Sequence, residues 1–311
     1  MVFGPPTIYT WPQYQVPWNY VQNASLDLQR GVGSWVFDIG YALNLTRHSN
    51  LSYDVNALPL GTYFQPSSLD ATNGNKPLPD ILLRRNFYGF NTVNQYAEIG
   101  TANYNALNAQ VQRRLSRGLA VGAAYTFSKA MGLTTFTPDV PNNHSWNYGN
   151  LSTNRPHNLQ ANWSYELPMA SPQIGKLLGA IVNHWTFSGV ASVQSGALYN
   201  PTFAFSSGTV PSYTGTSAVT ARMVVVGDPY ANVPSGSFFN PSAFALPALG
   251  TSSPTTPILG NMGGGGGLLE LPHVTNIDMT VSKFIPVFSE RRGFKIMVQA
   301  YNVLNHTEYS G

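Results

Sequence analysis

Apolar and polar residues alternate along eight segments of the chain. A period of two is the spacing of a β-strand, whose successive side chains point to opposite faces of a sheet. The segments comprise residues 20–30, 35–46, 105–114, 118–129, 157–167, 184–195, 274–284 and 294–304. Their lengths suit tilted membrane strands, which need about 9 to 11 residues. The pattern therefore predicts an all-β chain whose strands each have one apolar and one polar face.

The stretch YNALNAQVQRRLSRGLAVGAAYTFSKA, residues 104–130, shows the alternation most clearly. Two alternating runs flank a short break at LSRG, which predicts a hairpin. The first face carries Leu107, Ala109, Val111, Leu119, Val121, Ala123, Tyr125 and Phe127. The second face carries Asn108, Gln110, Gln112, Thr126 and Ser128, with small residues between them.

The connections between the segments alternate between short and long. Short ones fall at 31–34, 115–118, 168–183 and 285–293, and long ones at 47–104, 130–156 and 196–273. All three long connections fall at the same end of an up-and-down meander, as in transmembrane barrels with short periplasmic turns and long extracellular loops. We therefore expect an irregular segment 1–19 and then a partial antiparallel transmembrane β-barrel over 20–311, with about eight strands or slightly more.

Composition decides which face meets water. Charged residues make up 9% of the chain, against about 25% in soluble domains. A soluble β-sandwich or adhesin, the alternative from another class, needs a charged exterior that this chain lacks. We expect the apolar face to meet lipid and an uncharged polar face to line a lumen. The residues expected to face the lumen are Asn108, Gln110, Gln112, Asn158, Gln160, Asn162, Asp278, Thr280 and Gln299.

Two further expectations follow from the lipid-facing assignment. Aromatic girdles are expected to include Trp35, Tyr41, Trp163, Tyr165 and Trp185. An arginine in place of Val121 should cost about 2 to 4 kcal/mol if that site is near mid-bilayer, and one in place of Gly122 much less.

Several function classes have no support in the sequence. Cysteine is absent, which excludes a disulfide framework, a thiolate nucleophile and a Cys-based metal site. The net charge is +3 without a basic tract, so no nucleic-acid partner is expected. The six histidines fit no ligand spacing, and no carboxylate pair or Ser/His/Asp set is evident. We expect no enzyme activity, no catalytic or metal-binding residue and no cofactor.

Other stretches have both a structural and a functional interpretation. GNMGGGGG, residues 260–267, lacks the lysine of a phosphate loop and is expected to be a flexible loop. Arg155 and His157 are expected to be structural at a strand mouth. Arg113, Arg114, Arg117 and the stretch SERRGFK, residues 289–295, are expected either in solvated turns or against anionic lipid headgroups.

Loop aromatics with amide neighbours suit a carbohydrate or another bulky polar ligand. The candidate ligand-binding residues are Tyr53, Tyr63, Phe64, Phe87, Tyr88, Phe90, Trp146 and Tyr148. The start, MVFGPPTIYTWPQYQ, lacks the basic and apolar regions of a signal peptide. The sequence leaves open whether this is a mature start or a fragment.

Several stretches occurring together in order carry a family resemblance. They are YVQNASLDLQRGVGSWVFDIGYALNLTRH, NYNALNAQVQRRLSRGLAVGAAYTFSKAMG, RPHNLQANWSYELP, HWTFSGVASVQSGALYNP, FFNPSAFALP and VTNIDMTVSKFIPVFSERRGFKIMVQAYNVLNHTEY. With them the chain resembles the C-terminal barrel portion of outer-membrane TonB-dependent receptors of the Oar-like type, which usually contain a carboxypeptidase-regulatory-like domain.

The resemblance implies a location in the outer membrane of a Gram-negative bacterium and an unknown extracellular ligand. It implies two partners: outer-membrane lipid, and the TonB energy-transducing complex, which acts through a plug domain. Neither a plug nor a TonB box is evident, and eight strands compare with about 22 in the family. A receptor fragment is therefore the first expectation, and a small passive pore or structural barrel the alternative.

Overall fold

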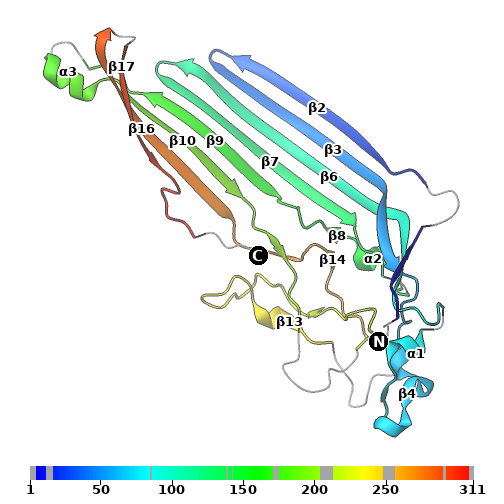
Figure 1. Cartoon of the computed structure of the whole chain (residues 1–311). Helices are drawn as coiled ribbons and strands as arrows, with labels where there is room; N and C mark the ends of the chain where they lie inside the picture. The colour runs from blue at the N-terminus through cyan, green and yellow to red at the C-terminus, as the bar shows by residue number, and fades with distance from the viewer. Residues whose placement is uncertain are drawn as a thin grey trace.

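The computed structural model describes residues 5–11, 17–84, 86–137, 139–141, 143–170, 175–203, 213–247, 256–289 and 292–307. Within these residues eight long strands form one antiparallel layer, curved and drawn as neighbouring arrows in Figure 1. The strands are β2 Tyr20–Val32, β3 Trp35–Asp54, β6 Val93–Ser116, β7 Leu119–Leu133, β9 His157–Glu166, β10 Trp185–Gln194, β16 Val274–Ser289 and β17 Arg292–Ala300.

The strands follow one another in space in nearly the same order as in the sequence. The order across the sheet is β17-β16-β10-β9-β7-β6-β3-β2. Among the described residues β2 pairs only with β3, and β17 only with β16. This up-and-down meander confirms the predicted all-β antiparallel class. A single layer also excludes the β-sandwich, which needs two packed sheets.

Tight turns join strands at one end of the sheet. Residues Gly33 and Ser34 separate β2 from β3, and Arg117 and Gly118 separate β6 from β7. Arg117 and Gly118 both have positive φ angles, 51° and 76°. Two positive φ angles mark the two-residue hairpin turn whose twist matches the flanking strands. The predicted break at LSRG is therefore a hairpin.

The long connections gather at the opposite end, and their described residues form only short elements (Figure 1). The helical ones are η1 Thr62–Phe64, η2 Pro66–Ser68, η3 Ala71–Asn73, α1 Asp80–Leu83, α2 Asn143–Asn147 and η5 Pro241–Ala243. The strands are β1 Ile8–Thr10, β4 Leu69–Asp70, β5 Lys76–Pro77, β8 Gly149–Asn150, β11 Leu198–Tyr199, β12 Val224–Val225, β13 Phe244–Ala245, β14 Gly264–Gly265 and β15 Leu269–Glu270. A further helix, α3 Lys176–Val182, lies at the tight-turn end. No described helix is long and apolar enough to span a bilayer.

Several predicted boundaries were wrong. β7 continues to Leu133 and β16 to Ser289, past the predicted ends at residues 129 and 284. The connection expected over 47–104 is shorter, because β3 and β6 stay paired as far as Asp54 and Asn94. The register shifts around Ser49, and such an irregularity breaks the alternation by which a strand is recognised. The last strand ends at Ala300, before the expected residue 304.

Residues 264–267 of the glycine run are packed against other segments, whereas Gly263 has open space around it. Gly264 and Gly265 form β14, which pairs in parallel with β8. A Cβ on Gly264 would collide with the Trp146 carbonyl, and one on Gly266 with the backbone of Ser152. The absence of side chains lets two backbones approach closely here, which corrects the flexible-loop interpretation.

The distribution of buried and exposed hydrophobic residues is the reverse of that in a soluble β-sheet protein. Most buried hydrophobic residues, such as Leu58, Leu83, Val93 and Leu269, lie in or beside the connections, and Ala106, in the middle of β6, is an exception. Leu28 and Ile39, on the long strands, are 67% and 49% exposed. The sheet therefore presents its apolar face outward instead of covering it.

Candidate functional site at the loop end of the polar face

Backbone register places the predicted polar residues on one face of the sheet. One row across β3, β6, β9 and β10 contains Asp38, Gln110, Gln160 and Ser192. Strand parity puts all nine residues expected to face the lumen on this same face. The opposite face of the same strands carries the apolar positions.

Amide and hydroxyl groups on the polar face bond to one another across strands. Thr126 Oγ1 donates to Asn108 Oδ1 at 2.9 Å. Gln160 Nε2 donates to Ser192 Oγ at 2.8 Å and to Asn158 Oδ1 at 3.0 Å. These groups can exchange such bonds for bonds to water or to a polar solute.

A polar cavity of about 380 Å³ lies where this face meets residues 153–155. Its walls come from β6, β7, β9, the end of β10 and the segment before β9. The polar residues that line it are Tyr104, Thr126, Ser128, Thr153, Asn154, Arg155, Asn158 and Gln194.

Specific bonds hold the segment before β9 against β7. Ser128 Oγ donates to the Arg155 carbonyl at 3.1 Å, and the Ala130 N–H donates to Asn154 Oδ1 at 2.7 Å. The Arg155 guanidinium donates to the carbonyls of Ser152 and Asn154. Since these partners are neutral, the cavity presents one cation among uncharged donors and acceptors. That set suits a polar or anionic solute.

The sequence indicated Arg155 but missed the cavity. Its lining residues lie as far apart as 104 and 194, and register alone brings them together. The His157 ring points to the other face, where Tyr125 Oη lies 2.7 Å from His157 Nδ1. Arg155 and His157 therefore do not share a site.

Of the predicted loop aromatics, Tyr63 and Phe64 lie in η1. Tyr63 Oη donates to Asp80 Oδ1 at 2.5 Å. Burial raises the pKa of the Tyr63 phenol, and the Asp80 carboxylate adds to the effect. Gly215, with φ of 70°, lies so close to Phe64 that a Cβ would clash with the ring. These two aromatics therefore join the 55–92 connection to residues 213–217.

The backbones of Phe87 and Phe90 bond to a different centre, the buried Asn56. Its side-chain amide donates to the carbonyls of Phe87 and Phe90, and its Oδ1 accepts from the Phe87 N–H. Tyr88 is 75% exposed. Its ring is the one most available to an external ligand.

Trp146 and Tyr148 lie in the connection between β7 and β9, and Tyr53 lies near the loop end of β3. The Arg222 guanidinium carbon lies 3.8 Å from the centre of the Trp146 ring, and burial lowers the pKa of Arg222. Asn103 Nδ2 donates to Tyr148 Oη at 2.9 Å. The Tyr53 ring packs on Phe136 with centroids 4.8 Å apart.

The eight aromatics therefore occupy separate places in the loop layer. Trp146 and Tyr148 share one segment, whereas Tyr63 and Phe87 lie in different parts of the 55–92 connection. None of the eight lines the 380 Å³ cavity. Many of their rings hold the connections together.

Cation–aromatic pairs mark the tight-turn edge of the apolar face. The Arg113 guanidinium carbon lies 5.6 Å from the Trp35 ring centre, and Lys283 Nζ lies 4.8 Å from that of Trp185. Trp163 shares the register row of Arg113. Among the predicted girdle residues, Tyr165 lies one step nearer the tight turns, and Tyr41 lies toward the loop end, paired with Leu107.

The same register shows where Val121 lies along the strand. It pairs with Arg113 on one side and Trp163 on the other. It therefore lies at the edge of the apolar band and not at mid-bilayer. Of the predicted basic stretch SERRGFK, Glu290 and Arg291 lie outside the described residues.

No group of three or more potential metal ligands occurs in the part of the chain that the structure describes.

A model of the family described as outer membrane beta barrel domain matches residues 2–311. Among solved structures, the outer membrane transporter YddB from Escherichia coli is similar at a TM-score of 0.43 and 11% identity. The match covers 98% of this chain and 31% of the transporter, so the chain spans about a third of that protein. No curated protein matches the sequence.

Proposed function

Because the chain belongs to the outer membrane beta barrel domain family, whose members lie in the bacterial outer membrane, we propose that it forms part of a transporter barrel. Its polar face lines a lumen, and its long connections meet a polar ligand on the outside. The role is binding and passage of a solute, without catalysis. The observation that carries this proposal is the register, which puts nine uncharged or acidic polar residues on one face and the apolar residues on the other.

The polar cavity is the proposed contact for the ligand near the mouth of this lumen. Arg155 supplies one positive charge, and Tyr104, Asn158 and Gln194 supply neutral hydrogen-bonding groups. A carbohydrate or another bulky polar solute carries many hydroxyl groups that pair with such a set.

Two neighbouring residues give a matched test of the lumen. Gln110 and Ala109 lie at the same depth on opposite faces of β6. In the membrane-embedded chain, a cysteine replacing Gln110 should react with a charged, membrane-impermeant thiol reagent. A cysteine replacing Ala109 should stay unmodified, because lipid covers it. Reaction at Ala109 with protection at Gln110 would reverse the two faces.

The two edge strands of the sheet, β2 and β17, determine how a barrel could close. Backbone groups unpaired in hydrocarbon are costly, so spanning sheets close on themselves. We propose that further strands pair with β2 and β17, as in the TonB-dependent receptors that the sequence resembles. A plug acted on by the TonB complex belongs to the same proposal.

Hydrogen exchange distinguishes these arrangements. In micelles of the isolated chain, amides of β9 should be protected and the outer amides of β2 and β17 should exchange. Protection at both edges in a monomer would mean that eight strands close alone. Single-channel conductance by that monomer would then favour the small passive pore.

A further inference from the structure

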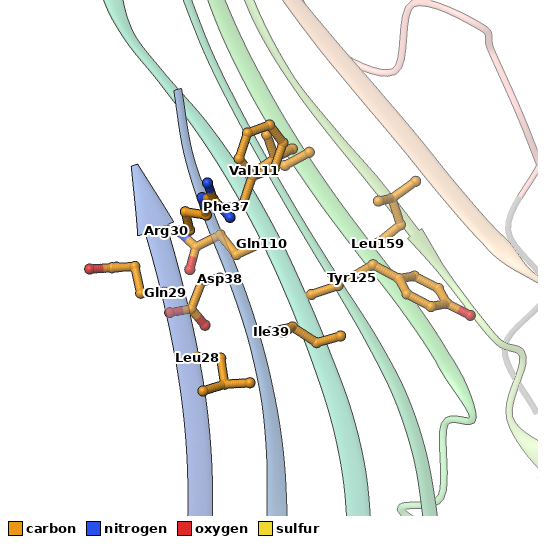
Figure 2. A pocket seen from close by; sticks show the side chains of 12 residues that line it. Leu28, Gln29, Arg30, Phe37, Asp38, Ile39, Gln110, Val111, Tyr125 and Leu159 are labelled. Carbon is orange, nitrogen blue, oxygen red and sulfur yellow. The ribbon is translucent and has the colours of Figure 1, made fainter. Parts of the chain in front are cut away.

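A groove of about 530 Å³ crosses the apolar face over β2, β3, β6, β7 and β9 (Figure 2). The groove forms because the pairing of the strands places small side chains beside large ones. Ala109 lies between Ile39 and Tyr125 in one row. In the next row Ala123 is paired with Val111. The two alanines therefore form a low floor between taller neighbours.

Apart from Arg30, the groove residues on the apolar face are all apolar or aromatic, and Gln29, Asp38 and Gln110 of the polar face also border the groove. Ile39, Tyr125 and Phe37 are between about a third and a half exposed, and Figure 2 shows Tyr125 and Leu159 on one side and Phe37 and Ile39 on the other. The face is continuous with the surface that an outer-membrane barrel presents to lipid. Its most suitable occupant is an acyl chain.

Two arginines lie toward the tight-turn end of this groove. Arg30 lines it and pairs in register with Phe37. Among the described residues the Arg30 side chain has no hydrogen bond or ion pair. Arg113 lies over Trp35, and its buried Nε has no hydrogen-bond partner. Each guanidinium group therefore has N–H donors that can bond to a ligand.

Position and chemistry together identify a ligand. Arginine forks match the oxygens of a phosphate, and tryptophan is typical of the headgroup level. Arg30 lies opposite Phe37 and Arg113 lies opposite Trp35, on the two sides of β3. At the usual spacings they are about 10 Å apart across the strands and about 7 Å apart along them, or about 12 Å in all, so two side chains of this length can approach one headgroup. The short turns belong to the periplasmic side of such barrels, so the inner leaflet is the source.

We propose that the groove binds one anionic phospholipid of the inner leaflet. An acyl chain lies over Ala109 and Ala123, and the phosphate lies between the guanidinium groups of Arg30 and Arg113.

Native mass spectrometry of the full chain in detergent tests this assignment. The folded chain is titrated with phosphatidylglycerol and, separately, with phosphatidylcholine. We expect one retained phosphatidylglycerol, at least tenfold tighter than phosphatidylcholine. The double variant Arg30→Gln/Arg113→Gln should lose most of that preference. Ala123→Leu, which keeps both arginines but raises the floor, should weaken retention of phosphatidylglycerol several-fold.

Arg292→Gln is the matched control. Arg292 is exposed on the same face at the tight-turn end of β17, away from the groove, so its replacement should leave retention unchanged. An equal loss in this control and in the double variant would overturn the proposal in favour of general charge attraction. Equal retention of the two lipids by the unaltered chain would overturn it without any variant. Unchanged retention in Ala123→Leu would overturn the placement of the acyl chain.

Discussion

The depth of the apolar band predicts the cost of a charge at each position of β6. Outward positions run from Arg113 through Ala109 to Asn105, four residues on each side of the centre. At about 3.3 Å per residue this is about 26 Å along the strand, or about 20 Å of membrane depth at a tilt of about 40°. Ala109 is therefore at the centre, and Ala109→Arg should destabilise the fold by about 2 to 4 kcal/mol.

Two further arginine variants distinguish the effect of membrane depth from the effect of which face of the sheet carries the charge. Val121→Arg lies in the row of Arg113, at the edge of the band, so it should cost about 0 to 1 kcal/mol. Gln110→Arg lies at the depth of Ala109 on the polar face, paired in register with Asp38, and should cost close to nothing. Ala109→Met controls for side-chain size without charge.

The assay is reversible unfolding by denaturant in phospholipid vesicles, followed by tryptophan fluorescence. Free energies of unfolding should rank Gln110→Arg and Ala109→Met near the unaltered chain, Val121→Arg slightly lower and Ala109→Arg lowest. Equal losses for Ala109→Arg and Gln110→Arg would mean that the faces are assigned wrongly. A loss at Val121 as large as at Ala109 would refute the depth derived from the register.

Three further changes test the contacts that hold the connections. Arg84 pairs with Asp54 at 2.9 Å and is only 9% exposed, so Arg84→Met should cost about 3 kcal/mol locally, seen as faster hydrogen exchange in the 55–92 connection. Lys283→Met removes a charge from the face of Trp185 and should cost about 1 kcal/mol in the vesicle unfolding assay. The raised pKa of Tyr63 means that its stabilisation is complete below about pH 10 and lost as pH rises through the folded-state pKa. Proteolysis of the loop layer at rising pH should show that loss, and Tyr63→Phe should remove its pH dependence.

Alternation predicted the strands well where one face is lipid and the other is polar. Between Leu107 and Phe127 the pattern assigned each residue to the face that the register gives it. It failed beyond Thr46, where the register between β3 and β6 shifts around Ser49 and interrupts the period of two. Beyond the shift the two strands stay paired as far as Asp54, next to the buried Val93.

The ligand-binding candidates show the limit of reading residue types. Aromatic rings in the loops as ligand contacts stay a prediction; in the structure Trp146 lies against Arg222 and Phe64 against Gly215. The polar cavity gathers Tyr104, Arg155 and Gln194 from separate elements. No short motif marks such a set.

The sequence by itself determined the all-β class, the two faces of the strands and the end at which the long connections lie. A period of two and a shortage of charge act locally, so both are visible in one chain segment. Only the tertiary structure decided the depth of Val121, the cavity at Arg155 and the groove over Ala109. Each depends on which residue stands opposite another across the sheet, and that register is fixed by backbone hydrogen bonds between strands far apart in the sequence.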